Sequence, residues 1–212
     1  PDAEHLLELA VPDGPPEGAV RQEAVDRAVA AAFWRWQGQD GREGELVAHD
    51  LEHVLSIAAD HLERGDVTSA AAVYTGAARG VATRYDAATD RGGHLAGLVY
   101  GCLQGLARCL ARSRDPEVRA ALLREVLGIH AWDLARGGSE IAQEARDVLV
   151  EGASGQERLR VADWAWESLA PGADAAARLQ RRGLGELILA LQAEALSDEE
   201  YLSLSAEAEL WE

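Results

Sequence analysis

The sequence predicts an all-α fold, an antiparallel array of helical hairpins with about ten helices. The 212 residues contain 41 alanines and 28 leucines but only 15 valines and 4 isoleucines, a balance that favours helix over strand. Apolar residues recur with the helical period, and no alternating run of β-branched residues is long enough for a sheet. Hydrophobic residues make up 48% of the chain, so the protein can bury a sizeable core.

Proline and glycine clusters divide this pattern into the expected helices. They interrupt it at 12–16, 38–44 and 137–138, while Gly65 and Pro171 mark two further helix ends. We expect helices over 2–10, 17–37, 45–64, 66–88, 92–112, 116–136, 139–152, 154–170, 174–196 and 197–210.

Helix starts carry their own signals. Asp66 is a suitable N-cap, because its carboxylate can accept from free backbone N–H groups of the first turn. Pro116 fits the first position of a helix, where no backbone N–H is needed. Ser154 followed by Glu157 is a capping-box pattern. These signals predict where three of the helices begin.

Short connections predict that successive helices pack antiparallel within one domain over 1–212. No connection is long enough to force a domain boundary. We divide the domain into an N-terminal helix and loop (17–44), an array of helical pairs (45–196) and an acidic C-terminal helix or tail (197–212).

The segment 51–82 carries the most specific pattern. Two of the expected helices meet there at the turn Gly65-Asp66, with small residues that let them approach closely and larger ones beside them. The small residues are Ala58, Ala70 and Ala77, and the larger ones are Val54, Ile57, His61, Leu62 and Tyr74. This spacing resembles a tetratricopeptide unit, whose period is about 34 residues. Val54 stands where that pattern has tryptophan, and Ala82 where it has proline.

A second resemblance covers His53–Gly172, which is similar to the helical region after the zinc finger in bacterial SWIM zinc-finger proteins. The shared features are the turn Glu63-Arg64-Gly65-Asp66 with Ala70 after it, the break at Tyr85-Asp86, the helix Leu95–Leu110 and the start Asp115-Pro116. The cysteine and histidine ligands of the finger itself are absent from this sequence. The resemblance therefore implies no zinc or nucleic-acid role here.

The helix expected over 45–64 presents a polar stripe opposite its apolar face. In tetratricopeptide arrays the first helix of each pair lines a concave groove, so the resemblance implies a peptide-binding face. The candidate partner-binding residues are His49, His53, Ser56, Asp60 and Arg64.

The same helix contains the pattern H-x-x-E-H of inverted zinc peptidases. His49 and His53 could bind zinc one helical turn apart, with Glu52 as general base, so a zinc-dependent hydrolase is the alternative function. Both histidines point away from the apolar face, and no third ligand can be singled out. We therefore favour a solvated or groove-facing histidine pair with no metal, no cofactor and no catalytic residues.

Glycine recurs every fourth residue at two places. One stripe contains Gly93, Gly97, Gly101, Gly105 and Cys109, and the other contains Ala72, Gly76 and Gly80. Glycine weakens a helix by about 1 kcal/mol relative to alanine, so close helix packing has to compensate. We expect the stripes to face each other or a third helix within the chain. A seam between two copies, which would make the protein a self-assembling structural protein, and a narrow ligand groove are the alternatives.

Two pairs of tryptophans lie two residues apart, Trp34 with Trp36 and Trp164 with Trp166. Residues at that spacing cannot share one helix face. We therefore expect most of them to occupy core positions or to wedge between helices, and one member of each pair to be exposed. An exposed tryptophan would be a suitable binding anchor.

Net charge, cysteine content and the length of the longest apolar stretch restrict which partners and which cellular compartment the sequence predicts. The net charge of −17 repels phosphate, which argues against nucleic acid and anionic membrane and favours a basic protein or peptide partner. Cys102 and Cys109 lie too far apart on one helix to form a disulfide, and we expect them to be buried in a reducing compartment. The longest nearly apolar stretch, Leu95–Ala107, is shorter than the roughly 20 residues of a membrane span. We therefore expect a cytoplasmic, non-enzymatic interaction module or scaffold.

Overall fold

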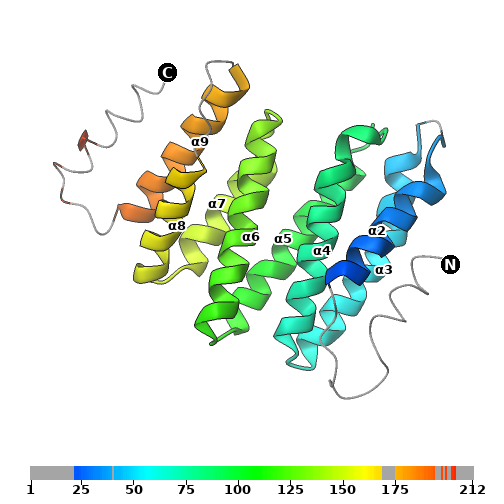
Figure 1. Ribbon diagram of the computed structural model, residues 1–212, viewed down its shortest axis with the longest axis horizontal. Coiled ribbons are helices and arrows are strands. Elements are labelled where there is room, and N and C mark those ends of the chain that lie inside the picture. The colour runs from blue at the N-terminus through cyan, green and yellow to red at the C-terminus, as the bar shows by residue number, and fades with distance from the viewer. Residues whose placement is uncertain are drawn as a thin grey trace. The chain divides into compact units, whose positions relative to one another are not determined.

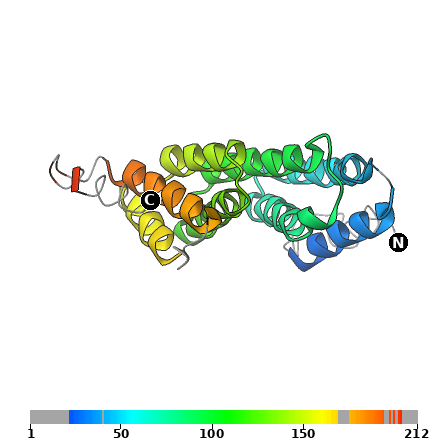
Figure 2. The same cartoon turned by 90° about the horizontal axis from the view of Figure 1, so that it is seen from above.

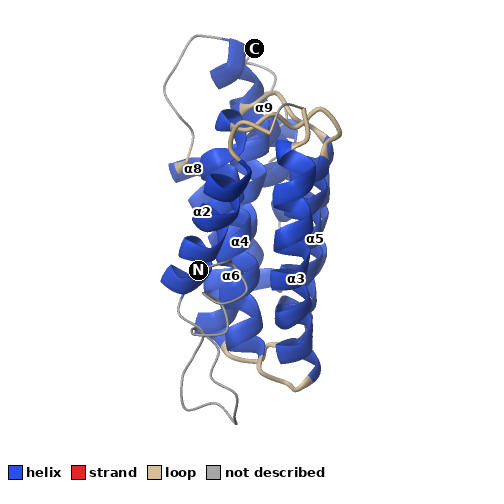
Figure 3. Ribbon diagram, turned by 90° about the vertical axis from the view of Figure 1, so that its right-hand side faces the viewer, coloured by secondary structure: helices blue, strands red, loops and turns tan. Residues whose placement is uncertain are grey.

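The computed structural model describes residues 22–39, 41–168 and 175–193 and four positions between 197 and 203. Within this part every element is helical, as Figure 3 shows, so the predicted all-α fold is confirmed. The helices expected over 2–10 and 197–210 lie outside the described elements. The count of ten helices and the repeated hairpin arrangement therefore stay predictions. No described helix has the length and apolar character that crossing a membrane requires.

Contacts between Cα atoms divide the chain into two compact units, Pro1–Val118 (unit 1) and Arg119–Glu212 (unit 2). The prediction of one domain without a boundary stays a prediction, since compact units can belong to one domain or to two. The described helices of unit 1 are α2 (Gln22–Trp36), α3 (Glu43–Glu63), α4 (Val67–Arg84), the short 3₁₀ helix η1 (Tyr85–Ala87) and α5 (His94–Arg112) (Figure 1 and Figure 2). Those of unit 2 are α6 (Pro116–Ala135), whose first three residues precede the unit boundary, α7 (Glu140–Gly152), α8 (Gly155–Glu167) and α9 (Ala175–Gln192).

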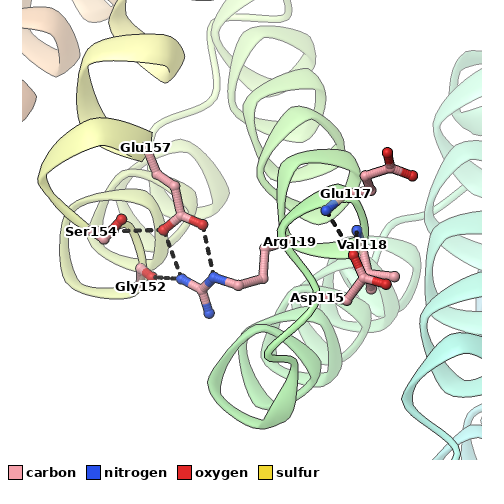
Figure 4. Close-up of polar contacts among 7 residues, drawn as sticks. All are labelled: Asp115, Glu117, Val118, Arg119, Gly152, Ser154 and Glu157. Carbon is pink, nitrogen blue, oxygen red and sulfur yellow. Dashed lines mark hydrogen bonds and ion pairs between the residues drawn. The ribbon is translucent and has the colours of Figure 1, made fainter.

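The predicted helix starts agree with the structure at three places. The Asp66 carboxylate accepts from the backbone N–H of Ser69 at 3.0 Å and caps α4. The first residue of α6 is Pro116, and the Asp115 carboxylate accepts from the N–H of Glu117 at 2.8 Å (Figure 4). Both bonds of the predicted capping box are present at the start of α8. Local side-chain chemistry therefore determines these boundaries.

The core of unit 1 forms where α4 packs against α2, α3 and α5. Its largest fully buried side chains include Tyr74 of α4 and Leu103 and Leu106 of α5. A Cβ at Gly105 would lie 2.4 Å from the Tyr74 ring, so only glycine leaves room for that ring. A Cβ at Gly80 would lie 2.8 Å from Val29 of α2. Close helix packing inside the chain is thus confirmed at both glycines.

The glycine stripe of α5 is not one continuous contact. Gly97 is exposed, and a Cβ there would meet no atom within 4 Å, while at Gly101 it would make ordinary contact with Leu55 at 3.5 Å. Gly93 precedes the helix with φ of +70°, a conformation that favours glycine. The expected packing within the chain is therefore found at Gly105 and not at Gly97. A four-residue spacing drifts around the helix, so its members meet different surroundings.

Both cysteines of unit 1 are free thiols buried in α5, as predicted. Burial raises the pKa of Cys102 to about 12 and that of Cys109 to about 11. Because the thiolate is the reactive form, both side chains behave as small apolar core residues at neutral pH.

In unit 2, α9 packs against α7 and α8, and an ion pair joins the start of α8 to α6. Arg119 donates to both carboxylate oxygens of Glu157 at 2.7 and 2.9 Å and to the carbonyl of Gly152 at 2.7 Å (Figure 4). Glu157 also accepts from the N–H of Ser154 at 2.8 Å. The hydrogen bond from Arg119, which outweighs the opposing effect of burial, lowers the pKa of Glu157 to about 2. One carboxylate thus caps a helix and fixes it to another.

Candidate functional site

Four of the five residues predicted to bind a partner lie on one exposed face of α3, and the fifth, Arg64, directly follows the helix. His49, His53, Ser56, Asp60 and Arg64 are all exposed. The opposite face is buried through Val47, Leu51, Ala58 and Leu62. The helical period therefore placed these side chains correctly, and their role in binding stays a prediction.

The exposed face of α3 is acidic. Besides Asp60 it carries three exposed glutamates, namely Glu45, Glu52 and Glu63. Its own side chains are held locally: the Ser56 hydroxyl donates to the His53 carbonyl at 2.7 Å, and Arg64 donates to the Asp60 carbonyl at 3.1 Å. Arg42 forms an ion pair with Glu45 at 3.0 Å, so this face and its two ends carry four exposed carboxylates and two exposed arginines, Arg42 and Arg64. We use the name α3 face for the exposed residues of this side of the helix, which are Glu45, His49, Glu52, His53, Ser56, Asp60, Glu63 and Arg64.

Among the described residues, the fold brings no third metal-binding side chain to His49 and His53, the two histidines of the zinc-peptidase pattern on α3. The closest approach between His49 and Glu52 is 3.9 Å, with side chains that are 81% and 72% exposed. Over the described ranges, no group of three or more histidine, cysteine, aspartate or glutamate side chains is arranged to hold a metal ion. A catalytic zinc site needs three protein ligands in a shielded setting, which these two solvated side chains do not supply.

The end of α2 contacts α3 through one of the predicted tryptophan pairs. The indole N–H of Trp36 donates to the Asp50 carboxylate at 2.8 Å, and Arg35 lies 4.9 Å from the Trp36 ring centroid and 3.5 Å from the same carboxylate. Trp34, its neighbour on the opposite side of α2, is 80% exposed. The expectation that one member of this pair is exposed is thus confirmed.

A pocket that sequence reasoning missed lies in unit 2 between α6, α7 and α9. It has a volume of about 300 Å³. Its polar walls come from His130 of α6, Gln143 and Arg146 of α7, and Arg182 and Glu186 of α9. Its remaining lining consists of Leu134, Gly138, Ser139, Ala142, Leu179 and Gly183. We call it the unit 2 pocket.

His130 is the most buried polar residue of this pocket. It is 2% exposed, and its Nδ1 atom is buried without a hydrogen-bond partner. Burial, with a smaller contribution from the positive charge of Arg146, lowers the pKa of His130 to about 4. The imidazole is therefore neutral at pH 7.

One hydrogen bond and two close approaches at glycines hold the helices around the pocket in place. Asp133 of α6 accepts from the N–H of Ala142 at 2.9 Å, so the helix cap of α7 comes from Asp133 rather than from Ser139, whose side chain makes no capping bond. A Cβ at Gly138 would overlap the Asp133 carboxylate. A Cβ at Gly183 would lie 2.5 Å from Leu134, so α9 approaches α6 closely there. In the sequence, the pair of glycines before α7 marked a helix boundary in this region but did not predict a pocket.

Comparison with known proteins adds no family to these observations. The chain matches no protein-family model, no curated protein and no solved structure. The tetratricopeptide and SWIM resemblances therefore stay predictions. Function has to be argued from the surfaces and the pocket themselves.

Proposed function

We propose that this chain is a non-enzymatic interaction module, a scaffold that binds a protein or peptide of basic character through the α3 face. Stacked helical pairs of the tetratricopeptide type belong to the same proposal, because they would present the first helix of a pair to a partner.

The observation that carries the proposal is the separation of roles on α3. One side of the helix is fully buried against α2, α4 and α5, which fixes its position. The other side exposes His49, His53, Ser56, Asp60 and Arg64 together, with no described helix covering them. A rigid helix with an exposed face is a suitable platform for a peptide or a second helix.

Charge indicates the kind of partner. The α3 face contributes four exposed carboxylates to a chain whose net charge is −17. Such a face attracts arginine- and lysine-rich segments and raises their association rate, and it repels nucleic acid. Trp34, 80% exposed on α2, offers unit 1 an aromatic contact as well.

The test compares two triple variants that each remove three negative charges. One carries Glu52→Gln, Asp60→Asn and Glu63→Gln on the α3 face. The matched control carries Glu151→Gln, Asp163→Asn and Glu167→Gln, three residues that are exposed in unit 2. The full chain captures partners from a lysate of its host, and the captured protein is purified and titrated at low and high salt.

We expect the α3 variant to bind this partner about tenfold more weakly and to lose most of its salt dependence, since exposed charges act mainly on association. The control variant should bind like the unmodified chain. Equal affinities of the two variants, or a partner whose binding does not depend on salt, would contradict the proposal.

A further inference from the structure

The unit 2 pocket is locally positive in a strongly acidic chain. Its lining includes two arginines, Arg146 and Arg182, and one carboxylate, Glu186, whereas the whole chain has a net charge of −17. The two arginines differ in their surroundings. Arg182 forms an ion pair with Glu186 at 3.3 Å. Within the described ranges no carboxylate forms an ion pair with Arg146, which is half-buried.

His130 supplies a second observation at the same place. A buried ring nitrogen without a partner destabilises the fold, a cost that an apolar side chain at this position would not carry. The ring also lies close enough to Arg146 for the positive charge to lower the pKa of the imidazole. The Nε2 atom of His61 in unit 1 is also buried without a partner, so the unpaired nitrogen is not sufficient by itself. At His130 the unpaired side chain also lines a pocket, and the two observations together indicate a site for a polar ligand.

The remaining walls are apolar. Leu134, Ala142 and Leu179 lie on three different helices around the same space. A ligand of this pocket therefore needs a negative group for Arg146 and an apolar part for these side chains. The volume of about 300 Å³ is at the lower end of the range for small-molecule sites.

We propose that the unit 2 pocket binds a small organic monocarboxylate, with the carboxylate on Arg146 and the hydrocarbon part against Leu134, Ala142 and Leu179. A guanidinium binds a carboxylate through two parallel N–H bonds, and the ligand supplies the acidic partner that Arg146 lacks. Inorganic phosphate fits less well, because its second charge would face Glu186 and it has no apolar part. This site does not depend on the α3 face, which belongs to unit 1.

The test titrates the full chain with three probes by calorimetry: hexanoate, its neutral counterpart hexanamide, and inorganic phosphate. We expect saturable binding of hexanoate with a Kd of about 1 mM or tighter, and binding of the other two at least about tenfold weaker. If hexanamide or phosphate binds as well as hexanoate, or if hexanoate does not bind up to about 10 mM, the proposal is wrong.

Three variants locate the site. Arg146→Gln removes the proposed partner of the carboxylate and should weaken hexanoate binding about tenfold or more. Leu179→Glu adds a negative charge to the lining at a residue that is 42% exposed, so the fold should tolerate it while hexanoate binding is lost. Arg160→Gln removes the same charge at an exposed site on α8 and should leave binding unchanged. If Arg146→Gln and Arg160→Gln bind hexanoate equally, the ligand does not occupy this pocket.

Discussion

Each unit buries a histidine, and the two differ in whether a carboxylate contacts the ring. The Nδ1 atom of His61 in unit 1 contacts the Asp66 carboxylate at 3.0 Å, and that carboxylate also caps α4; the Nε2 atom of His61 is buried without a partner. His130 of unit 2 has no carboxylate partner among the described residues, its Nδ1 atom is unpaired, and Arg146 acts on it electrostatically. The first histidine belongs to the structure of a helix turn, whereas the second lines a pocket.

The Asp66 carboxylate illustrates how a polar group becomes part of a core. Burial by itself would raise its pKa, but hydrogen bonds from Ser69 and from His61 outweigh that effect and keep the pKa of Asp66 below its ordinary value. In the unit 2 pocket no hydrogen bond to Nδ1 of His130 offsets the effect of burial. The difference teaches that burial alone does not distinguish a structural histidine from one at a binding site; the partner does.

The largest effect that we predict concerns the interior of unit 1. Gly105→Ala places a Cβ against the ring of Tyr74, which is 1% exposed and has no room to move, so the free energy of unfolding should fall by about 2–3 kcal/mol. Gly97→Ala, on the same helix with open space around it, should raise it by about 0.5–1 kcal/mol. Urea unfolding of both variants measures the two values.

The corresponding change in unit 2 is expected to cost less. Gly183→Ala meets the flexible end of Leu134, which borders the pocket and can shift into it. A loss at Gly183 as large as that at Gly105 would show that unit 2 is packed as tightly as unit 1.

The second effect is the pH-dependent contribution of Glu157 to the free energy of unfolding, which we expect to be about 2 kcal/mol at pH 7. Glu157→Gln leaves the guanidinium of Arg119, a side chain only 18% exposed, without its carboxylate, so unfolding at pH 7 should require less free energy. Because folding lowers the pKa of Glu157 from 4.5 to about 2, its contribution is complete above pH 4.5 and is lost as the pH falls toward 2. The difference between the variant and the unmodified chain, measured by urea unfolding, should shrink over that interval.

Glu151→Gln, at an exposed site on α7, is the control and should change stability little at any pH. A difference for Glu157→Gln that stays constant from pH 7 to pH 3 would mean that the ion pair does not stabilise the fold.

The smallest effects test the two histidine sites directly and should have opposite signs. Asp66→Ala removes the cap of α4 and the partner of His61, so the free energy of unfolding should fall by about 1 kcal/mol. His130→Leu removes an unpaired buried nitrogen and should raise it by up to about 1 kcal/mol. Thermal unfolding monitored by circular dichroism gives both signs, and a destabilising His130→Leu would place His130 with the structural residues.

The sequence by itself determined the features that depend on neighbours along one helix. Apolar periodicity placed the exposed side chains of the α3 face, and Asp66, Pro116 and the pair Ser154–Glu157 marked helix starts, because caps and helix faces involve residues within a few positions of one another.

Only the tertiary structure decided which glycine of a regular stripe is needed and where a pocket forms. Gly105 and Gly97 look alike in the sequence, and they differ because the Tyr74 ring, 31 positions before Gly105, lies against one and nothing lies against the other. Likewise the unit 2 pocket joins His130, Arg146 and Arg182, which no periodicity connects. Contacts between distant segments depend on how whole helices pack, and the pattern within each helix does not encode that packing.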